Sequence, residues 1–208
     1  MDAKSQSQLN DDLFEAARDG SITEIQSLLD RHADLHARDW NEQTPLHPAS
    51  LRGHHQCVEL LLDRHADTHA VDVHDNLPLH YASLNGHHQC VELLLDRHAN
   101  PNARNSDNRV PLHCASGSGH LQCVELLLDR HADINSLDMC NEAPIYLASK
   151  MGQHQCVELL IDHGADKSLT DVRHCVPSLS LSLPLSFARS CNLNILPASH
   201  TQISLSSC

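Results

Sequence analysis

Hydrophobic and polar positions repeat along most of this chain with a period of 33 residues. The segment from Gly53 to Ala66 returns unchanged at Gly86 to Ala99, and with one substitution at Gly119 to Ala132. A fixed period of this length is typical of a solenoid built from stacked modules. Five glycines mark the period: Gly20, Gly53, Gly86, Gly119 and Gly152.

Within one module the pattern predicts two helices. Pro45 favours the first turn of a short helix, where its missing N–H leaves no hydrogen bond unmade, and Thr44 before it can cap the other amides. Gly53 ends this helix. In the second helix apolar residues cover a broad face, as in a helix with neighbours on several sides. Its polar positions fall toward solvent: Gln56, Glu59 and Asp63. A polar, turn-forming stretch then leads to the next proline, so each module is helix, turn, helix and a long loop or hairpin.

Several segments of the module together resemble an ankyrin repeat: Thr44-Pro45-Leu46-His47, the Gly-His pair, the Val-Glu-Leu-Leu-Leu run and Ala66-Asp67. The resemblance covers about four-fifths of the chain. It implies an all-α ankyrin-repeat solenoid of helix-turn-helix modules joined by β-hairpin-like loops. We expect five modules, the first an atypical N-terminal cap. Their ranges are 11–39, 40–72, 73–105, 106–138 and 139–171.

Residues 1–10 and 172–208 lie outside the repeat, and we expect both segments to be disordered. From residue 172 onward the chain has no acid and is rich in serine and leucine. Prolines interrupt this tail, and the one stretch that alternates like a strand has no evident partner strand. An alternative is that the tail covers the open end of the last module, where apolar residues would otherwise face water. Those residues are Leu159, Leu160 and Ile161.

Departures from the family pattern predict an array weaker than the consensus. The helix-capping threonine is replaced by Leu77, Val110 and Ala143, each at a cost of about 1 kcal/mol. Pro48 lies inside the first helix of its module, which we expect it to distort locally. Where the family usually has glycine, two sets of other residues are expected to adopt left-handed conformations at a modest strain. They are His32, His65, His98 and His131, and Glu42, Asp75, Asn108 and Asn141.

Charge and composition exclude some partners. All 27 acidic residues and 12 of the 14 basic ones lie in residues 1–171, which carry a formal charge of −15. So acidic an array argues against nucleic acid as a partner. The N-terminus lacks the apolar core of a secretory signal, and no stretch approaches the length of a membrane span. We therefore expect a soluble, monomeric, intracellular protein of the cytoplasm, or of the nucleus as well.

Nineteen histidines and nine cysteines raise the question of a metal site. The His54-His55-x-Cys57 arrangement does not favour one, because Cys57 should point into the core and His55 outward, whereas structural zinc needs four converging ligands. The repeated cysteines should be reduced and buried. The Gly-His pair is expected to start the second helix and to hydrogen-bond the loop. Three further histidines should hold the loop backbone: His47, His80 and His113. We expect no metal, cofactor or small-molecule substrate.

Catalysis is not favoured either. An active site brings different groups together around one substrate, whereas a tandem repeat places the same group at intervals along a line. The sequence has no phosphate-binding glycine loop and no serine elbow. The repeat pattern therefore indicates a non-catalytic protein.

The predicted partner-binding surface comes from comparing the modules with one another. Their second helices hardly differ, whereas the loop tips and the ends of the first helices do. In the family that the chain resembles, these positions line a concave groove that binds proteins, and variety on one face of a uniform scaffold suits selective recognition. An exposed tryptophan favours binding over neutral drift. The candidate residues are Trp40, Asn41, Glu42, Pro48, Leu51, Arg52, Val73, His74, Asp75, Tyr81, Leu84, Asn85, Ser106, Asp107, Asn108, Cys114, Ser118, Met139, Cys140, Asn141, Leu147, Lys150 and Met151.

The sequence thus predicts a non-catalytic scaffold or adaptor that binds a protein partner through the concave face and the loop tips. Two alternatives stay open. The repeats can be the substrate-recognition or regulatory arm of a larger enzymatic assembly such as a ubiquitin ligase, or the chain can be a truncated variant with no dedicated function.

Overall fold

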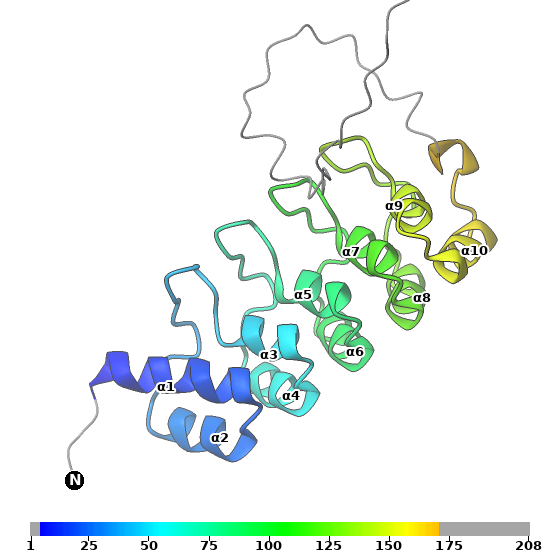
Figure 1. Cartoon of the computed structure of the whole chain (residues 1–208). Helices are drawn as coiled ribbons and strands as arrows, with labels where there is room; N and C mark the ends of the chain where they lie inside the picture. The colour runs from blue at the N-terminus through cyan, green and yellow to red at the C-terminus, as the bar shows by residue number, and fades with distance from the viewer. Residues whose placement is uncertain (1–4, 171–208) are drawn as a thin grey trace, which may run out of the picture. The chain divides into compact units, whose positions relative to one another are not determined.

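The structure, a computed structural model, describes residues 5–170. This part of the chain contains ten α-helices and one short 3₁₀ helix, η1 (Figure 1). Their bounds are α1 Gln6–Asp19, α2 Ile22–Asp30, α3 Leu46–Arg52, α4 His55–Asp63, α5 Pro78–Leu84, α6 His88–Asp96, α7 Pro111–Ser118, α8 Leu121–Asp129, α9 Pro144–Lys150, α10 His154–Asp162 and η1 Lys167–Thr170. Residues 5–170 contain no β-strand, so the all-α prediction is confirmed for them. The expectations about the tail, 172–208, lie outside the described residues.

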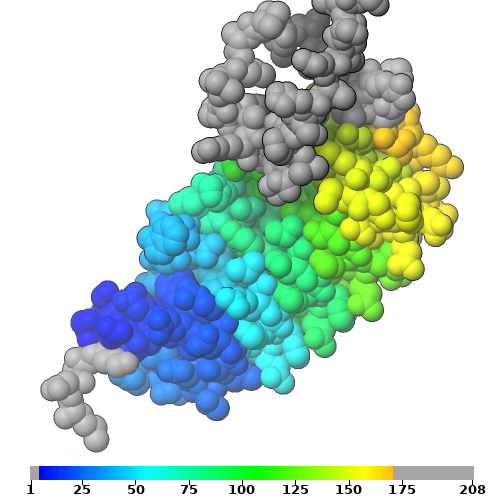
Figure 2. All heavy atoms as spheres, viewed as in Figure 1, coloured from blue at the N-terminus to red at the C-terminus, as the bar shows by residue number. Residues whose placement is uncertain are grey.

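The helices of residues 5–170 form two rows. The first helices of the pairs, α1, α3, α5, α7 and α9, contact one another in sequence, and so do the second helices, α2 to α10. Long loops between the pairs project from the side of the first helices (Figure 1). In the space-filling view the colours run from blue to yellow in successive bands along the array, in the order of the sequence (Figure 2). The helix-turn-helix solenoid expected from the sequence is therefore present. We call the five modules, in chain order, copies one to five.

The same core position is filled in the same way in every copy. The central leucine of the second helix is fully buried in copies two to five, as Leu61, Leu94, Leu127 and Leu160. Burying such a side chain contributes roughly 1.5–3 kcal/mol. The repeated cysteines are buried and free, as predicted, and burial raises the pKa of Cys90 and of Cys123 to about 12. Thiols with so high a pKa are unreactive and serve as small core residues.

The first helix begins earlier than expected. Residues 1–10 were expected to be disordered, but α1 starts at Gln6, and the Ser5 hydroxyl accepts a hydrogen bond from the Gln8 N–H at 3.3 Å. Leu9 and Leu13 lie on the same face of α1, and both are buried in the core. This apolar contact extends the helix through the segment, and the prediction of disorder is wrong for residues 6–10.

The 33-residue glycine period has a direct structural cause. Gly53 caps α3 with a left-handed φ of 75°, and the His87 ring of the next copy lies against it. A Cβ on Gly53 would come within 3.0 Å of that ring, and the same holds at Gly20 and Gly86. Glycine is therefore required for both the backbone conformation and the close approach of the ring.

We expected these histidine rings to hydrogen-bond the loop, and this prediction is wrong. They bond the preceding copy instead. The ring Nε2 atoms of His54, His87 and His120 lie 2.9–3.0 Å from carbonyl oxygens at the C-terminal ends of α1, α3 and α5. The acceptors are Arg18, Leu51 and Leu84. Carbonyls at a helix end have no partner within the helix, so each ring satisfies one of them and joins two copies.

Both sets of residues expected in left-handed conformations adopt them. The four histidines have φ between 64° and 67°, and the four tip residues have φ between 57° and 61°.

The expectations for α3 are less accurate. Pro48 lies in the first turn of α3, where no N–H is needed, and the helix continues to Arg52. The helix begins one residue after Pro45, whereas α5 begins at its proline, Pro78. Thr44 makes no side-chain bond to the helix amides.

Candidate functional site

Each loop tip is held by one side chain at its base. The Oδ1 atom of Asp72 accepts hydrogen bonds from the His74 and Asn76 N–H groups, both at 2.9 Å. The Asp72 N–H donates to the Asn76 carbonyl, which closes a hairpin-like turn. The same arrangement recurs at the other tips, where Asp39, Asn105 and Asp138 take this role. The tips are therefore fixed in shape before any partner binds.

Backbone hydrogen bonds join successive tips into a row. The Val73 N–H donates to the Asn41 carbonyl at 3.0 Å, the Ser106 N–H to His74 at 3.0 Å, and the Met139 N–H to Asp107 at 2.9 Å. We call residues 40–42, 73–75, 106–108 and 139–141 the tip row. Its regular spacing presents equivalent side chains side by side.

Three buried histidines connect the first helices to the backbone at the base of the next loop, as predicted. The Nδ1 atom of His80 accepts from the Leu77 N–H at 3.1 Å, and its Nε2 lies 3.1 Å from the Arg109 carbonyl in the next loop. Nδ1 is an acceptor, so the proton is on Nε2 and the ring is neutral. Burial lowers the pKa of His80 to about 4, and His47 and His113 make equivalent bonds.

Polar pairs that differ from copy to copy lie behind the tip row. The Tyr81 hydroxyl donates to Asp72, and the Gln43 amide donates to that hydroxyl at 3.2 Å. Burial, and then the Asp72 carboxylate, raise the pKa of Tyr81 to about 12.

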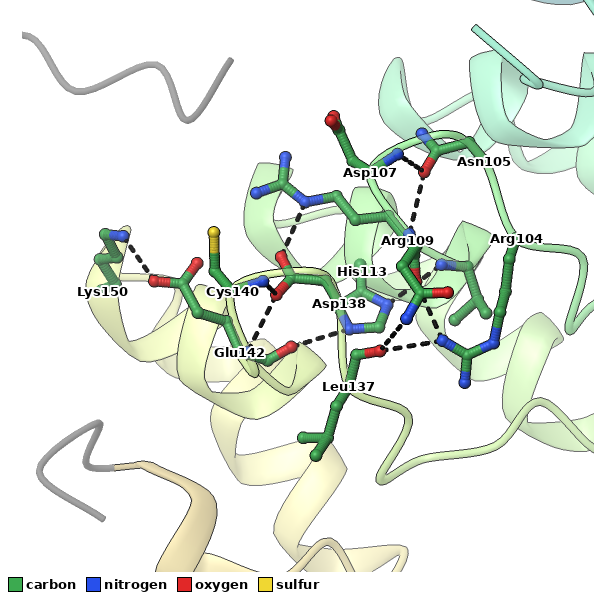
Figure 3. Close-up of polar contacts among 12 residues, drawn as sticks. Arg104, Asn105, Asp107, Arg109, His113, Leu137, Asp138, Cys140, Glu142 and Lys150 are labelled. Atoms are coloured by element: carbon green, nitrogen blue, oxygen red, sulfur yellow. Dashed lines mark hydrogen bonds and ion pairs between the residues drawn. The ribbon is translucent and has the colours of Figure 1, made fainter. Parts of the chain in front are cut away.

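Figure 3 shows the corresponding region at copies four and five. There Arg109 Nε donates to Asp138 at 3.0 Å, and Lys150 Nζ donates to Glu142 at 2.9 Å (Figure 3). The Asp138 side chain is fully buried. The residue two positions before the proline of each later first helix varies from copy to copy, and this variation in the aligned modules is the signal that could have revealed these pairs. The varying residues are Gln43, Asn76, Arg109 and Glu142.

The structure separates the candidate residues by exposure. Pro48 and Leu147 are buried and are corrections to the predicted surface. Pro48 lies in α3, which is flanked by α1 and α5, and Leu147 lies beside Gly117 of α7. Seven candidates are half-buried: Asn41, Leu51, Tyr81, Asp107, Cys114, Ser118 and Cys140. The remaining candidates are exposed: Trp40, Glu42, Arg52, Val73, His74, Asp75, Leu84, Asn85, Ser106, Asn108, Met139, Asn141, Lys150 and Met151.

Exposed large apolar side chains gather at these candidate positions. Of the six in residues 5–170, five belong to the predicted set and one, Leu121, does not. Trp40 is 88% exposed and Met151 62%. Trp40, Val73 and Met139 occupy the same position in their tips. We call the tip row together with residues 51–52, 84–85, 117–118 and 150–151 the inner surface.

On the second helices, by contrast, several exposed residues are the same from copy to copy. The same glutamine and the same glutamate are exposed in each of copies two to five. They are Gln56, Gln89, Gln122 and Gln155, and Glu59, Glu92, Glu125 and Glu158. We call these positions the outer surface. A side chain there is as accessible as one on the inner surface, yet it does not vary between copies.

A hollow of about 550 Å³ opens away from the candidate residues, at the ends of α4 and α6. Its cause is local. In the later copies Asn102 and Asn135 accept hydrogen bonds from the N–H groups of Asp133 and Asp166, which bridges neighbouring turns. In copy two this position is His69, which lines the hollow and is bonded to Thr68 instead.

No group of three or more His, Cys, Asp or Glu side chains within residues 5–170 is placed to hold a metal ion. None of the helices in that range is long and apolar enough to cross a membrane.

Comparison with curated proteins finds no match. The family model for ankyrin repeats, which contains three copies, matches residues 13–105 and again residues 97–171. The two matches together span more than half of the chain and reach all five helix pairs, the first from residue 13 onward. The chain therefore belongs to the ankyrin repeat family, whose repeats are generally protein–protein interaction modules and are typically not enzymes.

Proposed function

We propose that this chain is a non-catalytic scaffold that binds a protein partner through its inner surface. The supporting observation is the contrast between two accessible surfaces of one array. The outer surface carries the same glutamine and glutamate in copies two to five, whereas the inner surface differs in every copy and carries five of the six exposed large apolar side chains in residues 5–170.

This contrast argues against neutral drift. Drift acts on accessible positions irrespective of the surface they lie on, and would have varied Gln56 and Gln89 as much as Trp40 and Val73. The variation is concentrated at the inner surface, with a few other positions such as Leu121 and His69, so we attribute it to recognition of a specific partner.

The energetics also favour the inner surface. Burying a large apolar side chain at an interface contributes roughly 1.5–3 kcal/mol, and Trp40, Leu84 and Met151 are all exposed. The hydrogen bonds at each tip hold the backbone in place, so binding requires little ordering of the loops. A few exposed apolar anchors on a rigid frame are typical of protein-binding surfaces.

We further propose that the chain acts as a monomer in the cytoplasm or nucleus. Support for the compartment comes from the four buried, free cysteines of the second helices, Cys57, Cys90, Cys123 and Cys156. Unpaired thiols persist in the reducing environment of those compartments.

The test is affinity capture from cell lysate followed by mass spectrometry. The full chain is compared with a triple variant of the inner surface, Trp40→Ala, Leu84→Ala and Met151→Ala. A matched control changes the outer surface: Gln56→Ala, Gln89→Ala and Gln122→Ala. Circular dichroism must show that both variants are folded. We expect the inner variant to lose proteins that the parent and the outer variant retain. Equal losses in both variants, or none in either, would contradict the proposal.

A further inference from the structure

The tip row has an open end at Trp40. Each later tip donates one backbone N–H to the tip before it, from Val73, Ser106 and Met139. The corresponding donor of the first tip is the Trp40 N–H, and the copy before it has the helix α1 in place of a tip. Among the described residues no backbone acceptor faces this N–H. An extended chain that supplies a carbonyl oxygen there would continue the row.

The same end of the row is acidic. The left-handed position carries Glu42 and Asp75 in the first two tips but Asn108 and Asn141 in the last two. Both acids are exposed, and the backbone bond between Val73 and Asn41 holds their tips side by side.

The neighbouring charged groups leave these two carboxylates accessible. Arg38 approaches Glu42 at 3.4 Å, but its guanidinium also donates to the carbonyls of Glu42 and Val71 at 3.0 and 2.8 Å, which holds it at the base of the loop. The Asp39 carboxylate accepts from the amides of its own tip. The surroundings therefore favour a cation at the tips, where Glu42 and Asp75 face solvent.

We propose that this end of the tip row binds an extended basic segment of the protein partner. A carbonyl of that segment accepts the Trp40 N–H, and a lysine or arginine side chain lies over the Trp40 indole with its charge toward Glu42 and Asp75. This inference rests on the proposed function and names the kind of partner and the place where it binds. A cation over an indole is the most favourable pairing of a cation with an aromatic ring.

The geometry of an extended chain sets the spacing of the basic residues. Alternate side chains of a strand point to the same face, about 7 Å apart. A segment with lysine at every second position therefore presents cations to the Trp40, Glu42 and Asp75 side while its other residues point away. We use acetyl-Val-Lys-Val-Lys-Val-Lys-Val-amide as the probe, and the same peptide with glutamate for lysine as its control.

Trp40 is the only tryptophan of the chain and reports on its own site. The full chain is titrated with each peptide while its fluorescence is recorded, and the Trp40 backbone amide is followed by ¹⁵N NMR. We expect the lysine peptide to shift the emission saturably and to move the Trp40 amide resonance, and the glutamate peptide to do neither. Higher salt should weaken the effect, because the charges are exposed.

Two variants distinguish this site from general attraction to an acidic protein. Glu42→Gln with Asp75→Asn removes the two charges and keeps residue types that fit the tips, since asparagine stands at this position in copies four and five. We expect it to weaken binding roughly 2- to 30-fold, the range for two exposed ion pairs. The control, Glu92→Gln with Glu125→Gln, removes two exposed charges from α6 and α8 and should leave binding unchanged.

Three results would overturn the inference: no response to the lysine peptide, an equal response to the glutamate peptide, or an equal loss in both variants. The capture experiment from cell lysate distinguishes failure of this inference from failure of the proposed function. A partner that is lost on changing Leu84 and Met151 but binds irrespective of Glu42 and Asp75 would leave the proposed function in place and contradict the basic segment.

Discussion

The imidazole of His87 joins two copies of the array: its Nε2 lies 3.0 Å from the carbonyl oxygen of Leu51. The ring reaches that carbonyl across Gly53, which has no side chain to block it. Equivalent contacts recur at His54 and His120. Stacking of copies is thus reinforced by a hydrogen bond that depends on a glycine.

Gly53→Ala should destabilise the array through two separable effects. The left-handed backbone at φ 75° costs about 1–2 kcal/mol for alanine. Displacement of the His87 ring and loss of its hydrogen bond cost about 1 kcal/mol more. Urea unfolding of a double-mutant cycle with His87→Ala separates them. In the His87→Ala background, Gly53→Ala should cost only the backbone part. An equal cost in both backgrounds would show that the ring contact contributes nothing.

His69→Asn should stabilise the protein by about 0.5–1.5 kcal/mol. Asparagine at this position bridges neighbouring turns at Asn102 and Asn135, and His69 leaves the bridge unmade beside a hollow. The converse change, Asn102→His, should destabilise by a similar amount. Both are measured by the midpoint of urea unfolding. If the two variants move the midpoint in the same direction, the bridge does not explain the hollow.

Ser83→Ala should also stabilise, by about 1 kcal/mol. The hydroxyls of Ser50, Ser83 and Ser116 are buried without a hydrogen-bond partner among the described residues. Removing such a group relieves the free-energy cost of its lost hydration, and alanine favours helix. The matched control is Ser149→Ala, at the same position of α9 but exposed. Its gain should be limited to the difference in helix propensity, and an equal gain in both variants would contradict the argument.

Acidification should destabilise the fold through the buried histidines. Burial lowers the pKa of His80 and of His113 from 6.5 to about 4. Between these values the unfolded chain binds more protons than the folded one, so stability falls as pH falls. From pH 7.5 to 5 each histidine should remove roughly 2 kcal/mol. Urea unfolding measures the loss.

His80→Gln removes one of these groups and should reduce the fall in stability between pH 7.5 and pH 5. His154→Gln changes an exposed histidine of α10 and should leave the fall as it is in the parent chain. A fall of the same size in the His80→Gln variant would show that His80 does not carry the pH dependence.

Local features of the fold were predictable because they depend on residues close in sequence. The proline-led helices, the buried cysteines and the left-handed histidines such as His65 each follow from a short pattern read in phase with the period. The helical start at Gln6 was missed because its stabilisation comes from Leu9 packing into the core, which the polar local sequence does not reveal.

Partners that lie in another copy were harder to predict. The bond from His87 to Leu51 crosses between modules, and the repeat pattern does not specify whether the ring turns toward the loop or toward the neighbouring helix. Pro48 and Leu147 were assigned to the surface because their position varies between copies. Variation also occurs in the core, where Leu147 lies beside Gly117 and the residues of neighbouring helices adjust to one another.

We expect the inner surface, and not the outer one, to contact a partner. Site-specific photo-crosslinking tests it most directly, with benzoylphenylalanine placed at Leu84 of the inner surface or at Gln89 of the outer surface, both of which are exposed. After irradiation in cell lysate, we predict a discrete covalent adduct from position 84 and none from position 89. Adducts of equal yield from both positions, or an adduct from position 89 alone, would contradict the account.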